Sequence, residues 1–327
     1  MSEPQKSLVR QLVDDALMAC RDGWLLVRRR GPSQVQFWFI ALLVGIAASF
    51  AAIGFRFGIE TLQAWLYRTD DIANLRTDAA RLAWWWILLI PMGGGLLVGL
   101  ILDRFTNDGR VRSVADVIEG AALYDGRVER RKGLASSLAS FITLSTGGST
   151  GREGPVVHLA AIVSTYVSRL IRADGITGRD LLGCAVAAAV SASFNAPIAG
   201  ALFALEVVLR HFAIHALAPI VVASVTGTVI SRLSFGNTPA FDLQMVSTLA
   251  FSAELPAFLI LGLLAGMVAT IFMHSIFWAD QIATRIQDRL RVPHILRPVY
   301  AGVLLGLLAI WFPHIIGVGY ETTSQAL

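Results

Sequence analysis

The chain has 327 residues, of which 55% are hydrophobic and only 15% are charged, whereas a soluble domain carries about 25% charged residues. This composition is not that of a soluble domain, and it indicates an all-α integral membrane protein. The formal net charge of +4 does not indicate a nucleic-acid partner, because the arginines are scattered and form no basic patch with aromatic residues. The two cysteines and six histidines show no ligand spacing, so we expect no metal site and no cofactor.

Residues 1–35 are predicted to form a cytoplasmic amphipathic helix that lies along the membrane surface. Its apolar positions at helical spacing are Leu8, Leu12, Val13, Ala16, Leu17, Cys20 and Trp24. Acidic residues in the segment and the lack of a small-residue cleavage site argue against a signal peptide. Arg28, Arg29 and Arg30 precede the first span, so the N-terminus is expected in the cytoplasm.

Residues 36–327 are expected to form a single transmembrane domain. Apolar spans are predicted at 37–55, 82–102, 219–233 and 256–278, and a last one begins at 299–312. The connections 68–81 and 234–254 are expected outside the cell, and the arginine-rich connections 103–132 and 280–297 inside.

Two segments of this domain are predicted to be helix breaks. Residues 147–155, Gly-Gly-Ser-Thr-Gly-Arg-Glu-Gly-Pro, separate the short apolar segments 134–144 and 156–171. A second break, at Phe194, Asn195, Ala196 and Pro197, interrupts the apolar run 181–209. Short, interrupted apolar segments are typical of broken helices that meet near the membrane midplane.

The first break contains Arg152 and Glu153, charges that cost about 2.5 to 3.5 kcal/mol each at the centre of a membrane helix. Gly151 and Gly154 leave the backbone free to depart from helical geometry, and Pro155 suits the first turn of a new helix. Such a helix N-terminus carries unpaired N–H groups and a partial positive charge. The sequence therefore predicts part of an anion site here, within protein or along a water-filled cavity.

The roles of several polar residues in or near the two breaks are open to more than one interpretation. Glu119 is the best candidate for a structural ion pair with Arg152, since a buried guanidinium needs a carboxylate. Glu206, in an apolar run, suits a proton-handling or a structural role equally. Ser149 lies in a literal Gly-x-Ser-x-Gly pattern, but the absence of a strand pattern argues against an intramembrane serine hydrolase. His158 is interpreted as a polar residue packed in a helix.

Two motifs resemble those of the CLC chloride channels and chloride/proton exchangers. Residues 151–155, Gly-Arg-Glu-Gly-Pro, resemble the glutamate-bearing signature of that family. Residues 194–200, Phe-Asn-Ala-Pro-Ile-Ala-Gly, followed by Glu206, resemble the segment that comes next. The order and spacing agree, and the chain is similar to about the first two-thirds of the family's transport core.

The resemblance implies a homodimer with one chloride pathway per subunit, built from two inverted halves of tilted, broken helices, the second half incomplete here. Glu153 would be the gate, whose carboxylate mimics an anion and leaves the pathway when protonated or displaced. The residues implied to surround the anion are Ser113, Gly151, Arg152, Gly154 and Pro155. Glu119 and Arg152 match a family pair that is structural.

Three departures from the family pattern shape the functional expectation. The first anion motif, Gly-Ser-Gly-Ile-Pro, aligns with 112–116, and only its hydroxyl residue, Ser113, is kept. Val207 stands where exchangers carry a proton-transfer glutamate, which favours a CLC-type (voltage-gated) chloride channel over a chloride/proton antiporter. The chain ends before the family's last motifs. Either the sequence is truncated, which we expect, or the protein does not form a complete pore alone. A carrier selective for another small anion, such as fluoride or nitrate, stays open because of the changes at 112–116.

Overall fold

The computed structural model describes residue 18 and residues 32–69, 71–106, 108–212, 214–236, 251–319, 321 and 323. The all-α prediction is confirmed, since every regular element in these ranges is helical. Apart from Met18, the predicted surface helix of residues 1–35 lies almost wholly outside the described residues, as does most of the 234–254 connection. Six described helices are long and apolar enough to cross a membrane.

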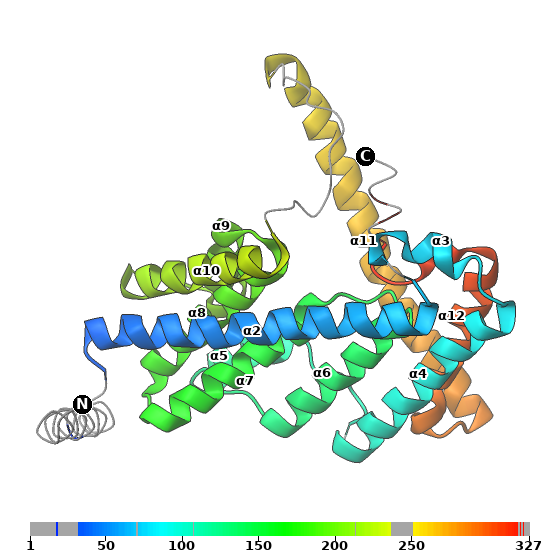
Figure 1. Cartoon of the computed structure of the whole chain (residues 1–327), viewed down its shortest axis with the longest axis horizontal. Helices are drawn as coiled ribbons and strands as arrows, with labels where there is room; N and C mark the ends of the chain where they lie inside the picture. Colours follow the sequence, from blue (N-terminus) through cyan, green and yellow to red (C-terminus); the bar gives the residue numbers. More distant parts are fainter. Residues whose placement is uncertain are drawn as a thin grey trace, which may run out of the picture. The chain divides into compact units, whose positions relative to one another are not determined.

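Figure 1 labels the helices in chain order. The elements before the second break are α2 (Gln34–Tyr67), η1 (Ile72–Asn74), α3 (Leu75–Ala79), α4 (Trp84–Phe105), α5 (Val114–Leu123), α6 (Arg130–Ser145), α7 (Glu153–Ile171) and α8 (Gly175–Phe194). The elements after it are α9 (Pro197–Phe203), η2 (Ala204–Leu209), α10 (Ile214–Phe235), α11 (Phe251–Leu290), η3 (His294–Leu296), α12 (Arg297–Trp311) and η4 (Pro313–Ile315).

The chain forms two compact units, and the first contains residues 1–62, 110–144 and 150–240. Its centre is α8, which packs against α7, α9 and α10 and has a run of fully buried small residues from Cys184 to Ala189. Small side chains allow helix backbones to approach closely. A Cβ at Gly227 of α10 would lie 2.2 Å from the carbonyl oxygen of Ala188, so this contact requires glycine. Both predicted breaks, from Thr150 onward, lie in this unit.

The second unit contains residues 63–109, 145–149 and 241–327. Its main contact joins α4 and α12, where Gly95 and Gly302 each lie against backbone of the other helix. Residues 145–149 are held within this unit, because the Tyr67 hydroxyl donates to the carbonyl of Thr146 (3.1 Å) and the amide of Gly317 donates to the carbonyl of Gly147 (3.1 Å). In α11 almost every described side chain is exposed, as expected of an apolar helix whose surroundings are lipid.

Several predicted boundaries were wrong. The first span continues to Tyr67, because Arg56 and Glu60 form an i, i+4 ion pair (2.7 Å) that suits a helix. The predicted cytoplasmic connection 103–132 contains the whole of α5. The connection 280–297 is helical as far as Leu290, since it has no glycine and no proline before Pro293. The sides of the membrane assigned to these connections stay predictions.

Candidate anion site at the helix breaks

The first break ends in a helix, as predicted. Arg152 is the N-cap of α7, Glu153 is its first residue and Pro155 lies in its first turn. The Glu153 side chain is exposed and turns back over the preceding residue: a Cβ built on Gly151 would lie 2.5 Å from Glu153 Oε2. A carboxylate thus lies at the positive end of α7, in space that the missing side chain of Gly151 leaves free.

Arg152 brings the two predicted breaks together. Its guanidinium donates through Nη2 to the carbonyl of Ser193 (3.5 Å), and its Cζ lies 5.5 Å from the centre of the Phe194 ring. Both contacts are at the C-terminal end of α8, where a cation is favoured by the helix dipole and by the aromatic face. The arginine therefore attaches the start of α7 to the end of α8.

The second break is also where the sequence predicted it. Asn195 adopts the left-handed conformation (φ 53°) that ends α8, and Pro197 begins α9. The Asn195 side chain accepts a hydrogen bond from Arg232 Nε (2.8 Å). The carbonyl of Pro197 accepts a hydrogen bond from the hydroxyl of Ser224. The conformation of this break is thus held by α10 on both of its sides.

Ser113 lies beside the start of α7, since a Cβ on Gly154 would be 4.0 Å from the Cα of Ser113. Ser113 is the N-cap of α5 and forms a capping box with Asp116. Its amide donates to Asp116 Oδ2 (2.7 Å), and its hydroxyl accepts from the amide of Ala115 (3.2 Å). The Ser113 hydroxyl, which the resemblance assigns to chloride, also donates to Asp116 Oδ2 (3.3 Å) and so already interacts with a carboxylate of this chain.

Two arginines hold the Asp116 carboxylate in place. Asp116 Oδ1 lies 3.2 Å from Arg112 Nη1 and 3.7 Å from Arg110 Nη2. Burial alone would raise the pKa of Asp116, but the Ser113 amide and the two guanidinium groups outweigh it, so this pKa lies below its ordinary value. Asp116 is therefore ionised at neutral pH. Only the Ser-x-x-Asp spacing of Ser113 and Asp116 indicated this carboxylate beforehand.

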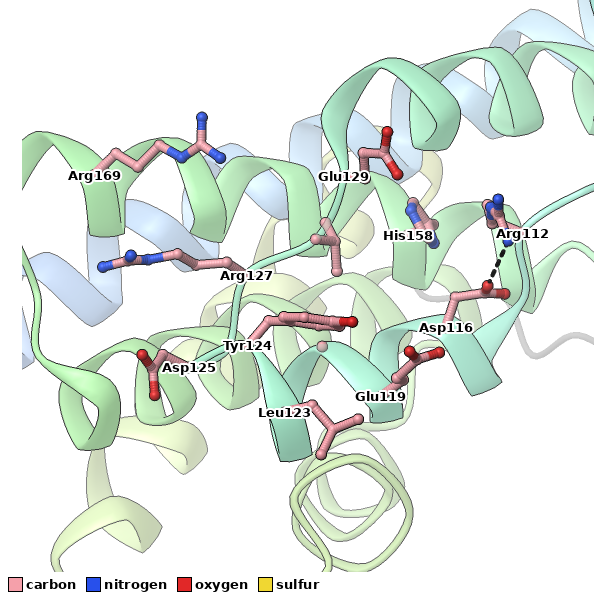
Figure 2. Close-up of a pocket in the computed structure, with 12 residues that line it drawn as sticks. Arg112, Asp116, Glu119, Leu123, Tyr124, Asp125, Arg127, Glu129, His158 and Arg169 are labelled. Atoms are coloured by element: carbon pink, nitrogen blue, oxygen red, sulfur yellow. Dashed lines mark hydrogen bonds and ion pairs between the residues drawn. The ribbon is translucent and has the colours of Figure 1, made fainter. Parts of the chain in front are cut away.

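A pocket of about 700 Å³ lies between α5 and α7, beside Ser113 (Figure 2). The sequence reasoning did not anticipate it, although four of its residues share one face of α5. Its lining consists of Arg112, Asp116, Glu119, Gly120, Leu123, Tyr124, Asp125, Arg127, Val128, Glu129, His158 and Arg169. Glu119 thus faces this pocket, and Arg152 is not part of the lining; the Glu119–Arg152 ion pair stays a prediction.

Glu206 and Ser149 have other surroundings than the sequence suggested. Glu206 lies in the π-helical turn η2 with an exposed side chain, so within this chain its carboxylate is not buried. The Ser149 hydroxyl donates to the carbonyl of Gly317 (2.7 Å), which is a structural contact within the second unit. Among the described residues no group of three or more His, Cys, Asp or Glu side chains is arranged to hold a metal ion.

Comparison with known proteins adds independent observations. The family model described as "Voltage gated chloride channel" matches residues 94–327. The ClcB-like chloride channel protein of Ralstonia nicotianae is 34% identical over 88% of this chain and 66% of its own length. The chain thus spans about two-thirds of that relative.

Two solved structures share the fold. A slow cyanobacterial chloride/proton antiporter superposes with a TM-score of 0.70 at 21% identity, over 90% of this chain and 68% of its own. A CLC-type fluoride/proton antiporter gives a TM-score of 0.68 at 22% identity, over 88% and 68%. Together with the family match and the two breaks, these similarities show that the chain belongs to the CLC family of voltage-gated chloride channels and related transporters.

Proposed function

We propose that this protein moves chloride across the membrane past the N-terminus of α7, and that Glu153 is its gate. The observation that carries the proposal is the position of the Glu153 carboxylate, which turns back over Gly151 at the positive end of the helix. A carboxylate in that position is a tethered anion, so it competes with a free halide for the same partial charge.

The gating mechanism follows from this competition. While Glu153 is ionised, its carboxylate occupies the place of an anion. A proton on the carboxylate removes the charge and with it the attraction to the helix end, so chloride then has access. Gly151, Gly154 and Pro155 leave the amides at the start of α7 available to the anion, and Arg152 fixes that helix end to α8.

The relatives support chloride as the transported ion. The Ralstonia relative is described as a chloride channel protein, and one solved neighbour as a chloride/proton antiporter. Val207 favours a channel, whereas the two solved neighbours are described as proton antiporters, so the proposal covers chloride transport with or without proton coupling. From the resemblance we also propose a homodimer in a bacterial-style inner membrane with a cytoplasmic N-terminus.

The test is chloride efflux from liposomes that contain the full-length protein, measured over a range of external pH. We expect wild-type efflux to increase as external pH falls, because protonation releases the gate. Glu153→Gln, which cannot ionise, should give efflux that no longer depends on pH. The matched control is Glu60→Gln, since Glu60 pairs with Arg56 along α2 and lies outside the helix breaks. Unchanged pH dependence in Glu153→Gln would contradict the proposed gate.

The capping of Ser113 by Asp116 favours a second candidate, transport of another small anion. A helix end that already interacts with its own carboxylate offers fewer free donors to chloride. Competition of fluoride and nitrate with chloride efflux distinguishes the two candidates. If fluoride or nitrate is transported and chloride does not inhibit that transport, the substrate is that anion and not chloride.

A further inference from the structure

We propose that Arg232, in the last turn of α10, recruits small inorganic anions to the outer entrance of the chloride pathway. The proposal rests on the proposed function, because it places this arginine beside the helix breaks that chloride would pass. The connection 234–254, which follows α10, is expected outside the cell. Arg232 therefore belongs to the outer end of the pathway, and it is part of neither break motif.

Arg232 is attached to the second break by a hydrogen bond. Its Nε donates to Oδ1 of Asn195 (2.8 Å), the residue whose left-handed conformation ends α8. About two turns earlier on α10, the hydroxyl of Ser224 donates to the carbonyl of Pro197. The two bonds hold this part of α10 against the start of α9, so the guanidinium has a fixed place beside the break.

The N-terminus of α7 is attached to the same place. Arg152, the N-cap of α7, donates to the carbonyl of Ser193 (3.5 Å), and its Cζ lies 5.5 Å from the centre of the Phe194 ring. Arg232 bonds to the next residue, Asn195. Guanidinium groups from α7 and α10 therefore lie against three consecutive residues at the end of α8. Arg232 is thus close to the helix end at which the gate is proposed.

No carboxylate of the described residues pairs with Arg232. Its side chain is exposed, its hydrogen bond goes to a neutral amide, and α10 contains no aspartate or glutamate. A second arginine, Arg56, lies with its Cζ 4.2 Å from the centre of the Phe235 ring at the end of α10, but it is paired with Glu60 (2.7 Å). Arg232 therefore supplies the net positive charge at this end of α10.

An exposed cation beside a pathway raises the local concentration of anions, because low-dielectric walls focus its field. Arginine and lysine side chains have this function in anion-selective pores. While Nε stays bonded to Asn195, the two terminal nitrogens of Arg232 can donate to an arriving halide. The competing explanation is structural, since a cation in the last turn of a helix also stabilises that helix. The two explanations differ in whether transport depends on the sign of the charge.

The experiment measures the initial rate of chloride uptake into liposomes as a function of external chloride, with Arg232→Cys in the full-length protein. Two membrane-impermeant methanethiosulfonate reagents, added from outside, each form a mixed disulfide with the new cysteine. One reagent attaches a trimethylammonium group and the other attaches a sulfonate. Wild type treated with the same reagents is the control for the chain's own two cysteines.

We expect Arg232→Cys to raise the apparent KM for external chloride about three- to tenfold, because one charge near the entrance is lost. The trimethylammonium group should return the KM to within about twofold of wild type, and the sulfonate should raise it further. The maximal rate should change little. An unchanged KM in Arg232→Cys, or equal effects of the two reagents, would overturn the proposal.

A second variant covers the case in which Arg232→Cys does not fold. Arg232→Gln keeps a side chain that donates to Asn195 and lacks the charge. Its KM should exceed that of wild type about threefold at 0.1 M ionic strength, where the Debye length is about 10 Å, and should approach it at about 1 M. Sodium gluconate sets the ionic strength. The control is Arg81→Gln, which removes an exposed charge from the connection 68–81 and should match wild type.

A KM difference in Arg232→Gln that does not depend on salt would be a structural effect and would also overturn the proposal. The Glu153 gate fails separately, if chloride efflux in Glu153→Gln still varies with pH. A protein that moves no chloride would overturn both proposals.

Discussion

The two helix breaks of the first unit differ in how firmly they are held. The break before α7 carries a titratable carboxylate with an exposed side chain, and a Cβ on Gly154 would meet nothing closer than 4.0 Å. The break before α9 carries no charge, and its Asn195 and Pro197 are bonded to Arg232 and Ser224 of α10. Both present a helix N-terminus. Only the first has a group whose charge and position can change.

This difference separates two contributions to an anion pathway. A rigid break supplies a fixed dipole that is available at any pH. A break with a titratable carboxylate supplies the same dipole together with a charge that a proton removes. In the proposed mechanism control belongs to α7 and constant geometry to α9, and three predictions test that division.

The largest expected effect is on packing. A Cβ on Gly200 of α9 would lie 2.0 Å from Ser191 Oγ and 2.7 Å from the carbonyl oxygen of Ala187. Overpacking of this kind costs about 1 to 3 kcal/mol, so Gly200→Ala should lower the melting temperature in detergent. Gly154→Ala, in the first turn of α7, should leave it nearly unchanged. Equal losses in both variants would mean that the two breaks are equally rigid.

The second effect concerns the turn at Asn195. Its left-handed conformation costs a residue with a Cβ about 1 to 2 kcal/mol, and asparagine tolerates it better than alanine. Asn195→Ala loses this tolerance and the bond from Arg232 (2.8 Å), whereas Asn195→Gly loses only the bond. Denaturant unfolding should therefore rank wild type above Asn195→Gly and Asn195→Gly above Asn195→Ala. The reverse order of the two variants would show that the backbone here is unstrained.

Both breaks were predicted from the sequence because each has a local signal. Pro155 and Pro197 suit helix starts, and glycine or asparagine precedes each of them. The lengths of α2 and α11 were not predicted. Hydropathy alone assigns a charged segment to a connection between helices, even where that segment continues a helix. Arg56 and Glu60 are four residues apart and pair along the helix. This i, i+4 spacing indicates a helix, and a hydropathy profile does not include it.

The surroundings of the site were less accessible to sequence reasoning. His158 was interpreted as a packed polar residue, and it is indeed buried, but its contact with Gly133 depends on the path of α6. Contacts between distant residues, such as that of Arg152 with Ser193, depend on packing that no local pattern encodes. The spacing of Ser113 and Asp116 did contain the capping box. It was not interpreted as a cap, because residues 112–116 were compared only with the family's anion motif.

The smallest expected effect comes from that cap. The pKa of Asp116 lies below its ordinary value, so the carboxylate stabilises the folded protein at pH values above its unfolded pKa. That stability is lost as the pH falls through the lower, folded pKa. Asp116→Asn should therefore cost about 1 kcal/mol or less at neutral pH, as other helix caps do. Melting temperatures of the variant and wild type should converge in acid. A constant difference down to low pH would show that the Ser113 cap holds without the charge, and α5 would then belong with the fixed break of α9 rather than with the titratable break of α7.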